Sequence, residues 1–310
     1  MSPLPDEGPE HGSRPASGVD DPAPAADAAP RRIIDWRRTL GARQAPTRGR
    51  RQSTFWRLRG EIPYPLRLAL GALGLATPIV IWAIVAQSAE SFIVPTPAET
   101  YTGFRDLWDR GVLWPDFRAS ITRIAVGYGI SVAIGVTIGV AIGSFRSFEA
   151  YFEPPIGFIR YIPATALLPL FLFWFGIDES PKLALIVVGT VFFNILMTAD
   201  VARNVPRQLI SAAYTLGADR LTVLRRVILP HSLPGIVDVA RINLAAAWLM
   251  LVVAELIAAE DGLAVRIVRA QRFRDVDEMF ALLLIFGLIG VVSDLSLRWL
   301  RNRVAPWARP

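Results

Sequence analysis

The chain has 310 residues, of which 53% are hydrophobic, and its mean hydropathy of +0.40 is too high for an ordinary soluble domain. The absence of cysteine excludes disulfides, thiolate metal sites and thiol nucleophiles, and two histidines are too few for a histidine-based metal or acid–base centre. The formal net charge is +6, and clustered positive charge beside apolar stretches is typical of membrane topology and anionic lipid contact rather than of nucleic-acid binding. We therefore expect a membrane protein with no metal and no cofactor.

Residues 1–60 form a separate N-terminal region without apolar periodicity. Met1 to Pro30 is rich in Pro, Ala, Gly and acidic residues and is predicted to be disordered. Arg31 to Arg59 is rich in arginine and holds a single acid, Asp35. No apolar run lies close to the N-terminus, so no signal peptide is expected. We interpret the basic stretch as a topology signal attached to an unstructured tail, with a lipid or partner contact as the alternative.

Residues 61–310 contain six apolar stretches long enough, or nearly so, to cross the hydrocarbon core of a membrane, which takes about 20 residues. They are Leu68–Ala86, Ile124–Gly143, Ile156–Gly176, Leu183–Asp200, Ile242–Ala258 and Met279–Leu297. The sequence thus predicts an all-α membrane protein with six transmembrane helices. Lysine and arginine are concentrated in the segments that this topology leaves in the cytosol when both termini are cytosolic. The loop Glu260–Glu278 is a counter-signal, because its four arginines then lie outside.

The second stretch carries a stripe of small residues at intervals of four. The stripe consists of Gly127, Ser131, Gly135, Gly139 and Gly143. Residues at this spacing share one helix face, and small side chains let another backbone approach closely. We expect this face to pack against a helix of the same chain or of a second copy.

The third stretch lies in the string RYIPATALLPLFLFWFGIDESPK, which begins at Arg160 and contains Pro163 and Pro169. Prolines are tolerated in membrane helices when neighbouring groups satisfy the backbone, and they break or bend the helix. The bend is either a gate element beside a translocation path or a static kink. Arg160 is a candidate ligand for an anion, but a topology charge at the inner end of this span is the favoured interpretation.

Polar residues within the other spans are further candidates for a translocation path, since ionisable groups in a membrane are costly unless they serve a function. Glu255, in the fifth span, either lines a cavity or extends to the interface. Asn194, in the fourth span, either contacts solute or bonds across helices. Asp294 and Arg241 lie near the same end of the last two spans and are able to pair.

A polar segment at residues 206–230 separates the fourth and fifth spans. A short helix is predicted to start at Pro206 and to stop at Gly217, and Asp219 is predicted to cap a second short helix that ends at Leu229-Pro230. Small residues gather on this segment, namely Ala212, Ala213, Gly217 and Ala218. Such a surface is suited to docking in a groove of another protein.

The same segment resembles the EAA loop of ABC-importer permeases, whose pattern is E-A-A, three residues, Gly, nine residues, Ile, one residue, Leu-Pro. The matching positions are Ser211, Ala212, Ala213, Gly217, Val227, Leu229 and Pro230, with Ser in place of Glu and Val in place of Ile. Together with the string that begins at Arg160, the region from Asp116 to Arg303 is similar to the nitrate/sulfonate/bicarbonate (taurine-type) branch of these permeases.

The resemblance implies a type I ABC-importer permease fold with cytosolic coupling helices in a cell-membrane protein. Residues 61–310 are then the transmembrane permease domain, which pairs with a second permease subunit, expected to be a second copy. The coupling loop 206–230 docks on cytosolic ABC ATPase subunits, and an extracytoplasmic solute-binding protein delivers the solute. Ser211 leaves the docking surface less charged than the Glu of the pattern. The resemblance assigns no catalytic residue to the permease, and the single lysine, Lys182, belongs to no phosphate-binding loop.

Two other classes of protein are alternatives. A secondary transporter that works without an ATPase would need paired intramembrane acids or inverted repeats, and no convincing inverted repeat is visible. A membrane anchor that only recruits a cytosolic partner would not need bent spans or Glu255. The sequence leaves the solute open among nitrate, a sulfonate such as taurine, bicarbonate and an organic precursor.

Overall fold

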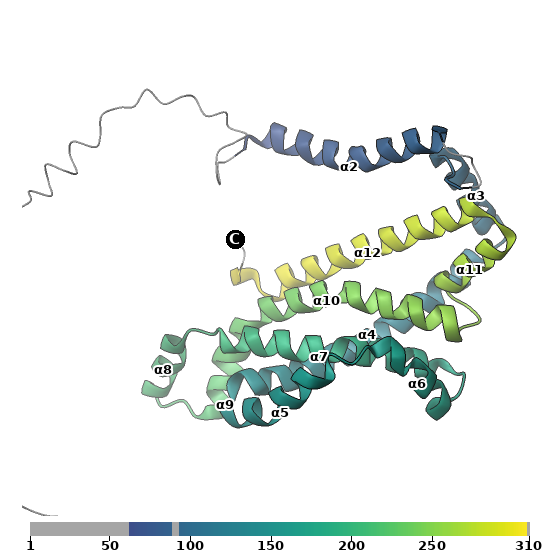
Figure 1. Ribbon diagram of the computed structural model, residues 1–310. Coiled ribbons are helices and arrows are strands. Elements are labelled where there is room, and N and C mark those ends of the chain that lie inside the picture. The colour runs from purple at the N-terminus through teal and green to yellow at the C-terminus, as the bar shows by residue number, and fades with distance from the viewer. Residues whose placement is uncertain (1–61, 89–92, 309–310) are drawn as a thin grey trace, which may run out of the picture. The chain divides into compact units, whose positions relative to one another are not determined.

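A computed structural model of the chain describes residues 62–88 and 93–308. Contacts divide the chain into residues 1–70 and 71–310, and nearly all of the described structure belongs to the second unit. The predicted N-terminal extension at 1–60 lies outside the described residues. Every regular element of the described residues is helical, so the prediction of an all-α protein is confirmed (Figure 1).

The helices follow one another with short connections. In chain order, they are α2 (Tyr64–Ser88), α3 (Pro97–Asp109), α4 (Leu113–Ser144), α5 (Arg146–Ile159), the 3₁₀ turn η2 (Ala164–Leu167), α6 (Leu168–Phe175), α7 (Glu179–Arg203), α8 (Arg207–Thr215), α9 (Arg220–Val223), the π-helical turn η3 (Leu224–Ile228), α10 (Leu229–Ala258), α11 (Leu263–Phe273), α12 (Val276–Val304) and the 3₁₀ turn η4 (Pro306–Ala308).

Among the described residues, five helical segments are long and apolar enough to cross a membrane: α2, α4, α7, the continuous segment Arg220–Ala258, and α12. The pair formed by α5 and the η2–α6 segment is a sixth candidate, bent by 79° at its break. The third span is bent, as predicted, but its predicted bounds were wrong. The broken segment runs from Arg146, directly after α4 ends, to Phe175 rather than from Ile156 to Gly176.

The direction of α4 and α7 shows that the broken segment crosses the membrane. A Cβ atom added to Gly127 would lie 3.1 Å from Ile186, and one added to Gly135 would lie 2.5 Å from the Cβ of Asn194. Residue numbers thus rise together along the two helices, which therefore run parallel. Because α4 and α7 cross in the same direction, α5 and α6 must carry the chain back between them, which brings the crossings to six.

The small-residue stripe of α4 lies against α7 of the same chain. A Cβ on Gly139 would lie 2.6 Å from the carbonyl oxygen of Ile195, and one on Gly143 would lie 2.7 Å from the Cβ of Ala202. Any side chain at these positions would push the two backbones apart. The close approach of α4 and α7 therefore depends on glycine.

Helices α4, α7 and α10 lie side by side and form the centre of the bundle (Figure 1). Ile124, Ile186 and Leu251 are buried where these three helices meet. A second core joins α12 to α3 and α11, and Leu107, Leu263 and Leu282 are among its members. By contrast, α2 buries only Ala86 in this single subunit.

Helix α3 was not predicted, although the sequence carries a signal for it. Thr96 accepts a hydrogen bond from the backbone N–H of Glu99, and the Glu99 carboxylate accepts one from the backbone N–H of Thr96. This reciprocal arrangement is the capping box, whose sequence form is Thr followed three residues later by Glu. Pro97 in the first turn strengthens the same signal.

Candidate functional site

The segment 206–230 begins as predicted. Helix α8 starts at Arg207 with Pro206 at its N-cap, and the chain turns at Gly217, whose φ is 80°. Two backbone hydrogen bonds close this turn, from Gly217 N to Tyr214 O at 2.9 Å and from Ala218 N to Ala213 O at 3.0 Å. A positive φ is readily adopted only by glycine, so the turn depends on Gly217.

Asp219 caps α9 as predicted. Its carboxylate accepts a hydrogen bond from the backbone N–H of Thr222 at 3.1 Å. The side-chain and backbone hydrogen bonds with Thr222 lower the pKa of Asp219, because they favour the charged carboxylate. The cap therefore stays ionised at neutral pH and starts the helix that follows.

The predicted stop at Leu229-Pro230 was wrong. The chain passes from α9 through the π-helical turn η3 into α10 without leaving the helix, and Pro230 lies in the first turn of α10. A proline inside a helix removes a hydrogen bond and clashes with the preceding turn. The wider turn η3, where Leu229 N bonds to Leu224 O, accommodates the proline ring and lets the helix continue.

The small residues of this segment divide between an inner and an outer face. Ala213 and Ala218 pack on a core formed by Ala202, Val205, Val223 and Ile228. Ser211, Ala212 and Gly217 are exposed, and no atom lies within 4 Å of a Cβ added to Gly217. Exposed leucines surround them, namely Leu209, Leu216 and Leu221. The described subunit thus presents a small-residue and apolar surface that is able to bind another protein.

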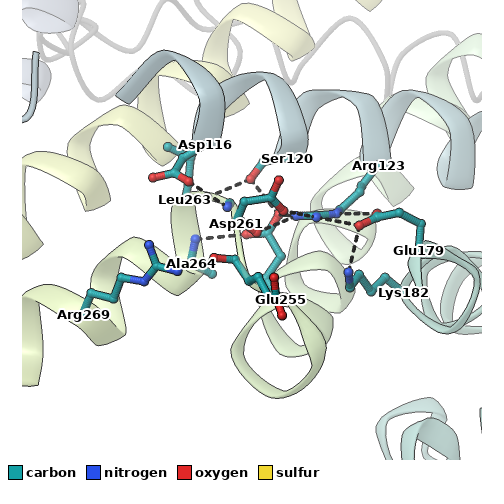
Figure 2. Close-up of polar contacts among 12 residues, drawn as sticks. Asp116, Ser120, Arg123, Glu179, Lys182, Glu255, Asp261, Leu263, Ala264 and Arg269 are labelled. Atoms are coloured by element: carbon teal, nitrogen blue, oxygen red, sulfur yellow. Dashed lines mark hydrogen bonds and ion pairs between the residues drawn. The ribbon is translucent and has the colours of Figure 1, made fainter. Parts of the chain in front are cut away.

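At the other end of the bundle, where α4 and α7 begin, charged side chains gather around the buried Arg123 (Figure 2). Some of them, such as Glu255, are buried, whereas Glu179 and Asp261 are exposed. We call this group the Arg123 cluster; its members are Asp116, Ser120 and Arg123 of α4, Glu179 and Lys182 of α7, Glu255 of α10, Asp261, and Arg266 of α11. None of the α4 members was identified from the sequence. The sequence nevertheless contained a signal for them, because their spacing of four and three residues places them on one face of a helix.

Arg123 has a hydrogen-bond partner for all of its N–H groups. It donates to Glu179 at 2.7 and 2.8 Å, to Glu255 at 3.0 Å, to the backbone carbonyl of Asp261 at 2.8 Å, and to the Asp261 carboxylate. Lys182 donates to Glu179 at 2.8 Å. A buried charge is tolerated only when it is paired and fully hydrogen-bonded, and Arg123 meets both conditions.

Glu255 is completely buried rather than lining an open cavity. Its carboxylate accepts hydrogen bonds from Ser120 at 2.7 Å, from Arg123 at 3.0 Å and from the backbone N–H of Ala264 at 3.0 Å. Gly262, with φ of 125°, lies so close that a Cβ there would be 2.5 Å from the Glu255 carboxyl carbon. The cluster thus ties α4, α7 and α10 to the loop that precedes α11.

The arginine-rich loop 260–278, which ran against the predicted topology, is held by the same cluster. Arg266 pairs with Asp116 at 2.6 Å, and Arg269 donates to the backbone carbonyl of Glu260. Arg266 and Arg269 therefore serve local contacts within the subunit. Elsewhere, Arg241 and Asp294, which the sequence suggested as a pair, are confirmed as one at 3.1 Å.

Asn194 is part of a buried polar chain between α4, α7 and α10. Its Nδ2 donates to the Ser131 hydroxyl at 2.9 Å, and its Oδ1 accepts from Asn243 at 2.8 Å. Thr190 donates to the same Ser131 hydroxyl at 2.7 Å. Ser131 therefore contributes a hydrogen-bond partner to the helix contact as well as a small side chain.

The break in the third span leaves Arg160 to Pro163 between α5 and η2. Pro163 is the N-cap of η2, and Pro169 lies in the first turn of α6, where a missing N–H costs little. The bend therefore lies at residues 160–163, and Pro169 does not cause it. Pro163 and Pro169 are both exposed in the single subunit.

Comparison with known proteins identifies the class to which this bundle belongs. Residues 131–309 match the family described as "Binding-protein-dependent transport system inner membrane component". The chain is 34% identical to the taurine transport system permease protein of Escherichia coli over 81% of this chain and 94% of that protein. It is 26% identical to the bicarbonate transport system permease protein of Synechococcus elongatus over 84% of this chain and 97% of that protein.

The fold is also found among solved structures. The methionine ABC transporter MetNI, in an inward-facing conformation, contains a chain that matches with a TM-score of 0.53 and 20% identity, over 64% of this chain and 96% of that chain. The match supports the type I permease fold predicted from the sequence.

The chain belongs to the family of binding-protein-dependent transport system inner membrane components. It is a multi-pass permease subunit of an ABC importer and is not itself catalytic, which decides among the three classes that the sequence left open. The resemblance to the sulfonate, taurine and bicarbonate branch is likewise confirmed.

Proposed function

We propose that this permease forms the translocation path for a small oxyanion and is driven by a cytosolic ATPase that docks on the segment 206–230. The exposed surface around Gly217 carries the docking proposal, because it is small, apolar and open. Ser211, Ala212 and Gly217 would contact the ATPase directly. Ala213, Ala218, Leu229 and Pro230 would hold that surface against the spans and transmit its movement.

The oxyanion class is supported by the relatives of the chain. One is named for taurine, a sulfonate, and another for bicarbonate. Both solutes present a compact group of oxygens that carries one negative charge. Nitrate shares this chemistry, so the proposal covers nitrate, sulfonates and bicarbonate.

Family membership implies an ATPase and an extracytoplasmic binding protein as partners. We further propose that two copies of this chain pair, with both termini in the cytosol and residues 1–60 as a basic cytosolic extension. In this arrangement the break beside Pro163 and Pro169 forms part of the wall of the path. Asn194 and Glu255 support that wall from inside the subunit, because their polar atoms form hydrogen bonds with other residues of the same subunit.

Uptake by a deletion strain tests the function. Cells that lack this gene should lose high-affinity uptake of radiolabelled taurine, nitrate or bicarbonate, and a plasmid copy should restore it. A plasmid that carries an exposed, remote substitution such as Arg303→Gln serves as the control for expression. Unchanged uptake of all three oxyanions in the deletion strain would contradict the oxyanion class.

A further inference from the structure

We propose that Arg160 is an anion-binding residue of the translocation path, placed at the break of the third span; this inference rests on the proposed oxyanion import. Arg160 lines a cavity of about 240 Å³ between the break, α7 and α10. Gly189, Phe192 and Met250 are among the lining residues. Among the described residues that line it, Arg160 and Tyr161 carry the only polar side chains.

The structure corrects the depth that the sequence suggested for Arg160. The residue was expected at the inner end of a span, where positive charge commonly fixes topology. Instead it lies in the break of the segment that runs from Arg146 to Phe175. It lines the same cavity as Gly189, which is near the middle of α7 and about 15 Å along the helix axis from Glu179 at the usual rise per residue. The hydrocarbon core of a membrane is about 30 Å thick, so Arg160 lies near mid-membrane rather than at its edge.

Arg160 also differs from the other arginines of the spans in its partners. Arg123, Arg203 and Arg241 each form ion pairs with carboxylates. Across residues 62–88 and 93–308, no carboxylate lies within ion-pair distance of Arg160. Its side chain contacts Tyr161 instead, with a hydrogen bond of 3.1 Å to the hydroxyl and a distance of 5.0 Å from the guanidinium carbon to the ring centre.

An unpaired charge at this depth cannot face lipid without a large cost. Arg160 is exposed in the single subunit, and so are Phe158, Tyr161 and Ile162 next to it. In the proposed transporter this surface adjoins the water-filled translocation path, where a positive charge is solvated and attracts anions. A guanidinium offers several N–H donors in one plane, which matches the oxygens of a sulfonate, nitrate or bicarbonate group.

Three variants separate this role from a topology charge. Arg160→Gln removes the charge, Arg160→Lys keeps it without the planar donors, and Arg146→Gln removes an exposed positive charge from the start of α5, in the same span. Each is expressed in the deletion strain with the full transporter. Initial uptake of labelled taurine, nitrate and bicarbonate is divided by the amount of permease in the membrane, and basal ATP hydrolysis of the purified complex is recorded.

We expect Arg160→Gln to lower oxyanion uptake about 10- to 100-fold, the usual effect of losing a hydrogen bond to a charged group. Arg160→Lys should retain more uptake than Arg160→Gln, and Arg146→Gln should match wild type in both uptake and basal ATP hydrolysis.

Uptake by Arg160→Gln within twofold of wild type would overturn the inference while leaving oxyanion import intact. Failure of this variant to insert or to bind the ATPase would assign Arg160 a structural role and overturn it as well. If wild type takes up none of the three oxyanions, the proposed function falls and the inference falls with it.

Discussion

Arg123 and Glu255 form an ion pair inside the subunit, with 3.0 Å between Nη1 of Arg123 and Oε1 of Glu255. The two residues are 3% and 0% exposed and come from α4 and α10. Arg123→Met should destabilise the protein by roughly 3–5 kcal/mol, because Glu255 would remain buried without its partner. The melting temperature of the detergent-solubilised protein measures the effect.

Arg118→Met is the matched control, since Arg118 is exposed on the same helix. Its melting temperature should stay close to that of wild type. Equal melting temperatures for the two variants would mean that the Arg123 cluster does not hold the helices together.

Two glycines of α4 should respond to alanine with opposite signs. Gly139→Ala should lower stability by about 1–3 kcal/mol, because its Cβ would lie 2.6 Å from the Ile195 carbonyl oxygen. Gly129→Ala should raise stability by up to about 1 kcal/mol, because nothing lies within 4 Å and alanine favours the helix. Thermal unfolding of both variants in one detergent is the measurement, and the same sign at both sites would refute the assigned α4–α7 contact.

Gly217→Glu should abolish binding of the ATPase while leaving the permease inserted. The substitution places bulk and an unpaired charge on the proposed docking surface, and the positive φ of 80° adds strain of about 1 kcal/mol. Gly111→Glu is the control, because Gly111 has a similar φ of 68° and equally open surroundings at the end of α3. In a pull-down at equal membrane abundance, ATPase recovery should fall for Gly217→Glu alone; equal recovery would remove the segment 206–230 from coupling.

Reporter fusions test the proposed orientation of the spans. Alkaline phosphatase is active only outside the cytosol, so fusions after Leu113 and Arg269 should be active and a fusion after Arg220 should be silent. An active fusion after Arg220 would place the segment 206–230 outside and would exclude contact with a cytosolic ATPase.

The sequence by itself determined most of the helices and several of their boundaries. An apolar stretch long enough to cross a membrane predicts a helix from its composition alone, because a membrane-spanning backbone must satisfy its hydrogen bonds internally. The start of α8 after Pro206, the turn at Gly217 and the cap at Asp219 were predicted because each depends on the backbone preference of one residue. These are short-range effects, so a single sequence reports them.

Only the tertiary structure decided how distant residues meet. Arg123 finds Glu179, Glu255 and Asp261 on separate elements, and no local pattern reports such partners. The position of Arg160 was likewise misjudged, because the depth of a residue depends on where a broken span bends and on the helix beside it. Pro230 was expected to end a helix, but the π-helical turn before it accommodates the ring. In each case the outcome depends on how elements distant in the sequence pack together. Short sequence patterns do not reveal that packing.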